Sequence, residues 1–458
     1  MKSLARLCPI ALLVCVACAA RPEGARDFLL GSWRGSATFR GADLDLSMRF
    51  FGEGDSLQGT VSSSDLMLLE QPLDSARYQG GHVRFATRDE HPLRFEGRLE
   101  GDTIRGTAPI AGVPGVVEAG GDRVQPVRFL LHRASAPPVP PYATREVRFA
   151  NGGVTLAGTL FVPSGGSRRH PGMVILQGSS SNLRKEYLFY ADHFARAGLV
   201  VLTFDKRGKG ESTGDYGAAT YHDLVGDAST AVEFLRRQPE VDPARTGIWG
   251  LSQGAFIAPL VAMRVPSIAF VVAVSPPGTT IGENAAYQDS VRLIGRGFST
   301  VEAAQAARLN RRILTWLGTG AREESLAADL SRHAHARWRR ASSLPVELPA
   351  RSSLPGWYWS GRTLDPLPSW RALRVPVLVV FGAEDELLSA AISAPRIERA
   401  LREGGNQDFV VRVFPAANHV LRRLPLVAGG AWDWPRAAPG YLELITDWVQ
   451  RHGAAGGR

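Results

Sequence analysis

The chain has 458 residues, a length that favours two domains over one. Hydrophobic residues make up 44% of it, which is ordinary for a globular protein and excludes wholesale disorder. The formal net charge is +9, but basic residues are interleaved with acidic ones and no nucleic-acid-binding motif accompanies them. We therefore expect a basic, solvated surface and no nucleic-acid partner.

Residues 1–20 have the pattern of an export leader. Lys2 and Arg6 give it a positive start, and residues 7–17 form an apolar stretch too short to span a bilayer comfortably. The small residues around Cys18 allow either cleavage that releases a secreted protein or a lipoprotein box in which Cys18 is lipidated. We expect an exported protein, namely a periplasmic or outer-membrane lipoprotein tethered through Cys18, or otherwise a secreted one.

The cysteines and the paired histidines argue against a metal site. All three cysteines lie in the leader, so the rest of the chain has no disulfide, thiol nucleophile or thiolate ligand. His333 and His335 are two positions apart, so they point in different directions on a helix, and no carboxylate spacing completes a ligand set. We expect them at the surface, and we expect neither a metal nor a cofactor.

Residues 27–133 read as short strands separated by turns, without a convincing helix. The expected strands are residues 32–39, 44–51, 57–61, 83–87, 93–99, 103–108 and 127–132. The fragments 55–60 and 102–107 are similar and suggest two related hairpins. We predict a small antiparallel β-barrel or sandwich, and we assign no chemistry to it.

Residues 134–144 predict an extended linker, because their consecutive prolines cannot enter a helix or an inner strand. Over residues 145–458 strands alternate with helices, which is typical of a mostly parallel sheet covered on both faces. The expected strands are residues 173–176, 200–204, 246–249, 270–274, 375–381 and 410–414, and the expected helices are residues 185–197, 221–237 and 440–452.

A segment of about 276–372 interrupts this alternation and is far longer than an ordinary connection. It contains helical patterns at residues 301–317 and 323–340, so we predict a helical cap over the active edge of the sheet. The cap is rich in arginine. We expect each of its aromatic side chains to pack within the cap, with some of the group lining a pocket: Trp316, Trp338, Trp357, Tyr358, Trp359 and Trp370.

Ser252 is the candidate nucleophile. It is the central residue of Gly-Leu-Ser-Gln-Gly, a G-x-S-x-G motif between an expected strand and a helix rich in small residues. Small residues around such a serine let strand and helix approach, and the tight turn lifts the hydroxyl above the sheet. The helix that follows directs its N-terminus at the site, which favours developing negative charge.

A serine hydroxyl needs a base, and the base needs an orienting acid; in this architecture their chain order is serine, acid, histidine. The expected strand 375–381 is followed by Glu384, Asp385 and Glu386, of which we choose Asp385 and expect both glutamates to face solvent. His419 is the only histidine between the next strand and the C-terminal helix. We therefore predict a catalytic triad of Ser252, Asp385 and His419.

The oxyanion hole needs two backbone N–H groups that converge on the developing negative oxygen. We predict that Gln253, directly after the nucleophile, provides one of them. The turn after the strand 173–176 provides the other, for which we favour Ser179, with Gly178 allowing the close approach.

These motifs resemble those of bacterial α/β-hydrolases of the dienelactone-hydrolase and serine-aminopeptidase-like groups. The resemblance rests on residues 204–215, Gly250 to Gly254, Gly382 to Asp385 and the pair Asn418-His419, and it excludes the N-terminal β-domain. It implies an α/β-hydrolase sheet and hydrolysis of an ester, thioester or amide without cofactor or metal. In relatives the loop at 204–215 shapes the site without doing chemistry, and Gln177 stands where they have histidine.

We take a carboxylesterase acting on a small-molecule ester as the leading hypothesis. An exopeptidase of the serine-aminopeptidase type would need an acidic cluster in the cap to hold a substrate ammonium, and the cap is rich in arginine instead. Acyl transfer is a further alternative. A non-catalytic surface-binding protein would have no reason to retain the whole triad. The sequence leaves the number of subunits open.

Overall fold

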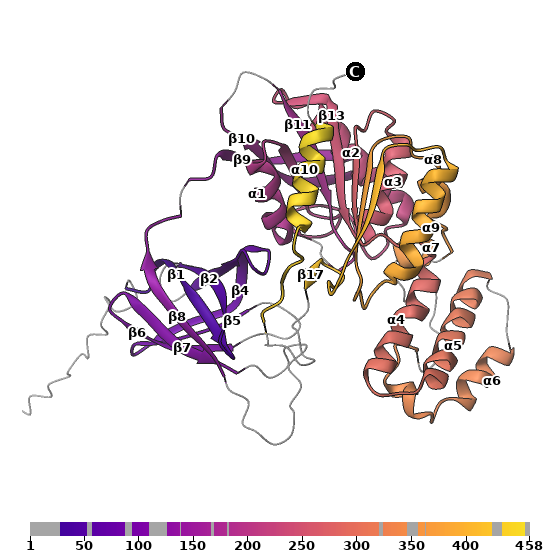
Figure 1. Cartoon of the computed structure of the whole chain (residues 1–458), viewed down its shortest axis with the longest axis horizontal. Helices are drawn as coiled ribbons and strands as arrows, with labels where there is room; N and C mark the ends of the chain where they lie inside the picture. Colours follow the sequence, from indigo (N-terminus) through magenta and orange to yellow (C-terminus); the bar gives the residue numbers. More distant parts are fainter. Residues whose placement is uncertain are drawn as a thin grey trace, which may run out of the picture.

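The computed structural model describes residues 28–52, 57–87, 94–109, 126–137, 139–165, 169–180, 183–319, 324–345, 356–361, 363–423 and 433–453. The predicted leader, with Cys18, lies outside the described residues. Three parts are visible in Figure 1: an N-terminal barrel, a sheet with helices on both faces, and a group of helices beyond one edge of the sheet. Of the described helices, none is both long and apolar enough to cross a membrane.

The N-terminal part is a closed barrel of antiparallel strands, which decides between the two predicted architectures. Its strands are β1 (Gly31–Phe39), β2 (Ala42–Phe51), β3 (Gln58–Ser63), β4 (Leu68–Gln79), β5 (His82–Thr87), β6 (Arg94–Glu100), β7 (Thr103–Ala108) and β8 (Val127–Ala134). Strand β8 pairs with β1 and closes the barrel. Alternate side chains point inward, and the rings of Phe50, Phe85, Phe95 and Phe129 contact one another there, so side chains fill the interior.

An eight-stranded sheet follows, in the order β16-β15-β14-β13-β11-β12-β10-β9. Its strands are β9 (Tyr142–Asn151), β10 (Val154–Pro163), β11 (His170–Leu176), β12 (Val200–Phe204), β13 (Val241–Leu251), β14 (Val271–Val274), β15 (Val377–Gly382) and β16 (Phe409–Phe414). The strands from β11 to β16 are parallel, and the β9–β10 hairpin adds an antiparallel edge. The central strands are buried along their whole length, as expected for a sheet covered on both faces.

Two layers of helices cover this sheet. One apolar core lies beneath α2 (Tyr221–Arg236), α3 (Gln253–Arg264), α8 (Leu367–Ala372) and α9 (Ala390–Glu403). The core on the opposite face lies beneath η1 (Arg184–Tyr187), α1 (Leu188–Arg196) and α10 (Tyr441–Gly453). The β9–β10 hairpin was not among the expected strands, and β9 begins at Tyr142, inside the predicted linker.

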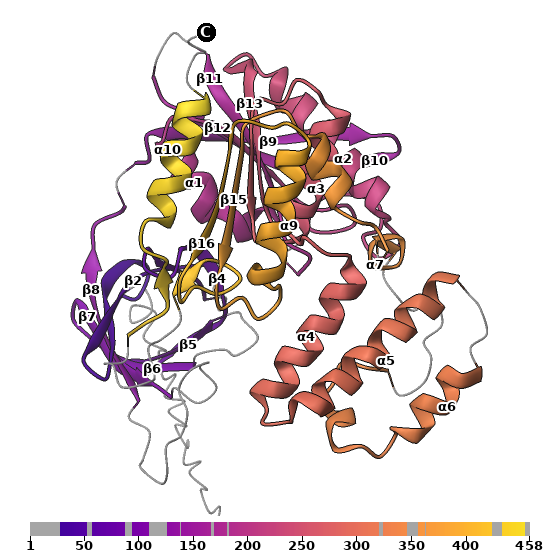
Figure 2. The same cartoon turned by 45° about the vertical axis from the view of Figure 1, so that its right-hand side comes forward.

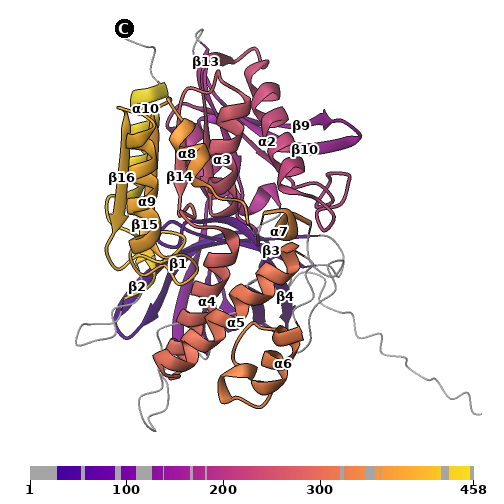
Figure 3. The same ribbon diagram turned by 90° about the vertical axis from the view of Figure 1, so that its right-hand side faces the viewer.

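The cap consists of α4 (Ile281–Gly295), α5 (Thr300–Thr319), α6 (Glu324–Arg332), η2 (Arg337–Arg340) and α7 (Gly356–Gly361). Its helices α4 to α6 and η2 pack around a small core of their own. The single helix predicted at 323–340 is wrong: α6 ends at Arg332, and a turn separates it from η2. The His333 ring bonds to the Asp329 carbonyl at this turn, at 2.8 Å. Figures 2 and 3 show the cap beyond the edge at which the parallel strands end.

The barrel and the sheet domain each insert one side chain into the core of the other. Met67, in the turn between β3 and β4, joins the core beneath α1 and α10, where the Tyr190 hydroxyl contacts its sulfur at 3.8 Å. Trp434 is 3% exposed inside the barrel, and its indole N–H donates to the Ala42 carbonyl at 3.0 Å. Arg436 adds an ion pair with Asp65. Trp434 and Arg436, which follow His419 in the chain, are therefore fastened to the barrel.

Replacing Trp434 by alanine is expected to lower the free energy of unfolding by about 3–5 kcal/mol, because a large buried side chain leaves a cavity in the barrel. Trp434→Phe keeps most of the packing but leaves the Ala42 carbonyl without its donor, for which we expect a loss of about 1–3 kcal/mol. Urea unfolding followed by circular dichroism measures both. Wild-type stability in Trp434→Ala would show that the inserted indole does not support the barrel.

Candidate active site

Ser252 occupies the turn between β13 and α3. Its backbone has φ 54° and ψ −111°, a conformation that non-glycine residues rarely adopt and that marks functional turns. The Ser252 N–H donates to the Val274 carbonyl at 2.9 Å, and its own carbonyl accepts from Phe256 at 2.9 Å. The serine is thus fixed by both the neighbouring strand and the helix that it precedes.

Gly254, two residues after the candidate nucleophile Ser252, allows this turn. A Cβ on Gly254 would lie 2.1 Å from the Leu176 carbonyl oxygen, so only glycine lets α3 approach the end of β11. A Cβ placed on Gly178 would lie 3.7 Å from the Ser252 Cβ. The turn that follows β11 therefore lies directly beside the serine.

Asp385 and His419 form a hydrogen-bonded pair. His419 Nδ1 and Asp385 Oδ2 are 2.8 Å apart, and both residues are buried. The other carboxylate oxygen, Oδ1, accepts from the backbone N–H groups of Leu387 and Leu388, each at 2.9 Å. Asp385 can therefore hold the imidazole with Nδ1 protonated and leave Nε2 for chemistry.

A glycine also lets the loops of the acid and the histidine meet. A Cβ on Gly382 would lie 2.2 Å from the carbonyl oxygens of Ala417 and Asn418. Glu384 and Glu386, on either side of Asp385, are exposed, and only Asp385 turns inward to His419.

The histidine loop and the serine turn converge on the end of β14. Ser252 donates to the Val274 carbonyl, and the hydroxyl of the next residue, Ser275, donates to the His419 carbonyl at 2.8 Å. No hydrogen bond joins the Ser252 and His419 side chains among the described residues. In unliganded enzymes catalytic hydrogen bonds are often long and tighten only with substrate, so this geometry is compatible with proton transfer.

The predicted oxyanion donors lie on two adjacent segments. Gln253 is the first residue of α3, where a backbone N–H has no partner within the helix. On the other segment, the Gly178 N–H donates to the Tyr187 hydroxyl at 2.8 Å, which leaves the Ser179 N–H as the candidate of this turn. Gln177 turns inward, and its amide donates to the Phe204 carbonyl, so it ties β11 to β12.

Lys206 and Tyr216 form a polar group behind these donors. Neither was predicted as a site residue, because the loop at 204–215 was expected to have a structural role. The buried Lys206 ammonium donates to the Gly178 carbonyl and to Gln253 Oε1, the latter at 2.9 Å. The Tyr216 hydroxyl bonds to Gln253 Oε1 at 3.1 Å and to the Ser179 carbonyl at 3.2 Å. The sequence did offer one signal for this group: Lys206 follows β12 after a single aspartate, at the strand end where site residues gather.

The cap contacts the acid loop and the loop that follows Lys206. From α4, Tyr287 donates to the Asp385 carbonyl at 3.0 Å and Gln288 to the Leu387 carbonyl at 2.9 Å. Trp357 of α7 packs with its ring centroid 6.1 Å from that of Tyr216. The cap therefore lies against the edge of the sheet that carries the candidate site, as predicted for a cap over the site.

Most of the cap aromatics serve packing. Trp338 is buried in the cap core, and Trp316 and Tyr358 pack against it. The expectation for Trp370 is wrong: it lies on α8, outside the cap, and is buried in the core of the sheet domain because α8 covers the sheet. The side chain of Trp359 lies outside the described residues. His335 is exposed. Within the described part of the chain no group of three or more His, Cys, Asp or Glu residues could hold a metal ion.

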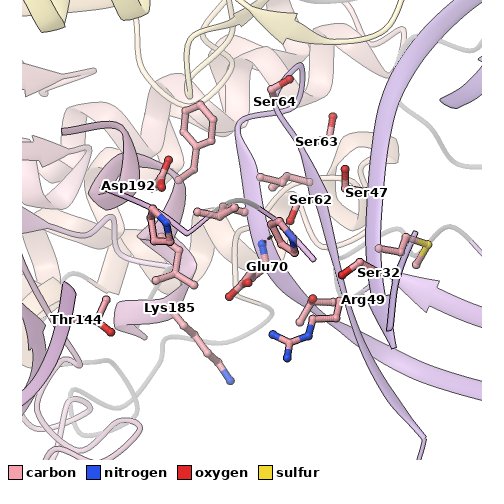
Figure 4. Close-up of a pocket in the computed structure, with 18 of the residues that line it drawn as sticks. Ser32, Ser47, Arg49, Ser62, Ser63, Ser64, Glu70, Thr144, Lys185 and Asp192 are labelled. Carbon is pink, nitrogen blue, oxygen red and sulfur yellow. Dashed lines mark hydrogen bonds between the residues drawn. The ribbon is translucent and has the colours of Figure 1, made fainter. Parts of the chain in front are cut away.

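A cleft of about 1310 Å³ lies between the barrel and the sheet domain. Figure 4 shows Arg49, Ser62 and Glu70 of the barrel facing it, together with Lys185 and Asp192 of the sheet domain. None of the three residues of the predicted triad lines this cleft. It is therefore a feature of the domain interface, distinct from the triad.

The comparison with known families agrees with this architecture. A model described as serine aminopeptidase, S33, matches residues 173–423, more than half of the chain. The chain belongs to this family, and it is an α/β-hydrolase. The match covers the three residues of the predicted triad and the cap, and it leaves out the barrel.

Relatives and solved structures of several kinds are similar to this chain. It is 39% identical over 127 residues to the polyketide transferase ATR5 of Stachybotrys chlorohalonatus, which is 27% of this chain and 41% of the relative. It is 34% identical over 130 residues to the thiohydrolase apmlB of Arthrinium phaeospermum, which is 27% and 40% of the two chains. The structure of the Pyrococcus furiosus esterase Pf2001 is 18% identical, covers 68% of this chain and 90% of its own, and has a TM-score of 0.42.

Proposed function

We propose that this α/β-hydrolase cleaves carboxylic ester bonds through an acyl-enzyme on Ser252. The observation that carries the proposal is the hydrogen-bonded Asp385–His419 pair beside the end of β14, where the strained Ser252 turn is also fastened. Family membership supports hydrolytic chemistry, and the triad geometry supports serine as the nucleophile.

In this mechanism His419 Nε2 takes the hydroxyl proton as the Ser252 oxygen attacks the acyl carbon. The carbonyl oxygen becomes negative and is stabilised by the N–H groups of Ser179 and Gln253. The bond from carbon to the leaving oxygen then breaks, and His419 returns the proton to the departing alcohol. Water repeats the attack with His419 as base, which releases the acid and restores the serine.

The exopeptidase alternative lacks a site for a substrate ammonium in the described cap. Its carboxylates are already engaged: Glu283 and Glu302 cap helices through Thr280 and Ser299, and Asp289 and Asp329 pair with arginines. An amine-binding pocket needs an acceptor that is not already paired. Ester cleavage is therefore the better-supported activity despite the name of the family.

Thioester cleavage or acyl transfer is a second candidate for the same site. The observation that favours it is the presence of a thiohydrolase and a polyketide transferase among the relatives, although the chain spans only about 40% of their lengths. An acyl-enzyme on Ser252 accepts either leaving group, and an alcohol or amine in place of water would turn hydrolysis into transfer.

The decisive experiment is covalent labelling with a fluorophosphonate, located by mass spectrometry, alongside p-nitrophenyl esters of increasing chain length, acyl thioesters and aminoacyl anilides. We expect the label on Ser252, turnover of esters and no turnover of anilides. Added alcohols and amines would reveal transfer as ester or amide products. A chain that is folded, unlabelled and inert on every substrate would contradict the proposal and favour a non-catalytic binding role.

A further inference from the structure

Lys206 lies behind the predicted oxyanion hole and contacts both halves of it. It is the second residue after β12, is 6% exposed, and donates to the Gly178 carbonyl and to Gln253 Oε1 at 2.9 Å. The Gly178 carbonyl and the Ser179 N–H belong to the same peptide unit. The ammonium therefore bonds to the carbonyl of the peptide unit whose N–H is the candidate donor to the substrate oxygen.

Lys206 lacks the carboxylate partner that would neutralise its charge in the described part of the chain, whereas both adjacent charged residues form ion pairs. Asp205 forms an ion pair with Arg184, and Arg207 pairs with Asp227 at 2.7 Å. Among the described residues no ion pair joins Lys206 to a carboxylate. Burying an ammonium without a carboxylate costs free energy, and an apolar side chain would fill the same space without that cost. Packing alone does not account for a lysine here.

We propose that Lys206 is a positioning residue that orients and polarises the Gly178–Ser179 peptide and the Gln253 side chain for oxyanion stabilisation. The proposal rests on the proposed function and assigns Lys206 no contact with the substrate. It acts through the backbone N–H of Ser179 and through the first residue of α3.

The physical basis is the planar peptide. Resonance couples the carbonyl to the N–H of the same unit, so a charge-assisted bond to the oxygen draws electron density from the nitrogen and strengthens the N–H as a donor. Hydrogen bonds in series reinforce one another, and a site with low dielectric enlarges the effect. The benefit appears only when an oxyanion forms, so the ammonium favours the transition state over the ground state.

The protonation state of Lys206 gives this role a pH signature. Burial lowers the pKa of Lys206 to about 7, although Glu186 acts to raise it. Burial also raises the pKa of Tyr216 to about 12 and the pKa of Tyr221 further, so both stay protonated in this range. The titratable or charged groups around the ammonium are Tyr187 before α1, Glu186 on η1, Lys209 and Tyr216 on the same loop, and Tyr221 and Asp227 on α2.

The test compares wild type, Lys206→Met and Lys209→Met in the full chain, with kcat for a p-nitrophenyl ester measured from pH 5 to pH 9. Lys209 is the matched control because it is exposed on the same loop and lies over the same Tyr216 ring at 5.9 Å. At pH 6 we expect Lys206→Met to lower kcat about 10- to 30-fold with KM little changed, somewhat less than the loss of a direct oxyanion donor.

The decisive quantity is the ratio of the two kcat values, because pH effects that do not depend on Lys206 are common to both proteins and cancel in the ratio. We expect the ratio of wild type to Lys206→Met to fall towards one by pH 9, as the wild-type lysine loses its proton. A ratio that is constant from pH 5 to pH 9, or a variant as active as wild type, would overturn the proposal. Wild type that is not labelled at Ser252 would instead overturn the proposed function.

An independent measurement does not depend on turnover. An unfolded lysine keeps its proton to pH 10.5, so above pH 7 the unfolded chain binds more protons at this position than the folded one. The free energy of unfolding of wild type should therefore rise between pH 7 and pH 10 relative to that of Lys206→Met. Parallel curves would show that the lysine does not titrate in the folded protein and would contradict the pH-dependent role.

Discussion

Ser252→Ala is expected to lower kcat for ester hydrolysis about 10,000- to 1,000,000-fold, to the level left by binding and the oxyanion donors alone. The reason is that the hydroxyl supplies the bond to the acyl carbon, and no cysteine outside the predicted leader offers a substitute nucleophile. Substrate binding should change little, because alanine fills the same turn. Steady-state kinetics with a p-nitrophenyl ester, combined with loss of the fluorophosphonate label, measure the effect.

The matched control for this substitution is Ser229→Ala. Ser229 is buried in α2, and its hydroxyl donates within the helix to the Val225 carbonyl at 2.7 Å. It should keep kcat within about twofold while losing some stability. If Ser252→Ala retained more than about one hundredth of the wild-type kcat, covalent catalysis at Ser252 would be wrong.

Asp385→Asn is expected to lower kcat about 10,000-fold, as the loss of the orienting carboxylate does in serine triads. The amide preserves shape but not charge, so it cannot hold His419 with Nδ1 protonated or stabilise the imidazolium that forms during attack. One of its ends also has to face the two backbone donors, Leu387 and Leu388, that now bond to Oδ1. We expect the variant to fold, because the side-chain volume is unchanged.

Glu386→Gln is the control for Asp385→Asn, since it removes the same charge from the adjacent, exposed position. It should leave kcat within about twofold. The double variant Ser252→Ala with Asp385→Asn should be no slower than Ser252→Ala alone, because triad members act as a unit. Additive losses, or equal effects of the two acid-loop substitutions, would mean that Asp385 is not the partner of His419 in catalysis.

Local patterns in the sequence were sufficient to predict the bounds of a fully buried strand. Strand β12 has the predicted bounds, 200–204, because a strand buried on both faces is apolar at nearly every position; only Thr203 is polar here. Strand β4 was not predicted, since Pro72 and the polar run after it suggest a loop; its pairing with β3 and β5 around the barrel makes it a strand. Gly152 and Gly153 were a usable signal for the missed hairpin, because they form the two-residue loop between the paired Asn151 and Val154 and Gly-Gly favours such turns.

The candidate site also has residues that the sequence could predict and a residue that it could not. Chain order and flanking motifs pointed to Ser252, Asp385 and His419, because a strand-turn-helix nucleophile and carboxylates at strand ends are local features. Lys206 could not be assigned from its neighbours in sequence, since its partners Gly178 and Gln253 come from two other loops.

The sequence by itself determined the family, the barrel-or-sandwich class of the N-terminal part and a candidate nucleophile, acid and base, because each depends on a pattern within a few residues. Only the tertiary structure decided that the barrel closes and that Trp434 packs into it, although Trp434 lies 392 residues after Ala42 in the chain. The tertiary structure also decided that Asp385, rather than an adjacent glutamate, contacts His419. Those outcomes depend on which surfaces exclude water together, and burial of that kind is a property of the packed chain rather than of any one segment.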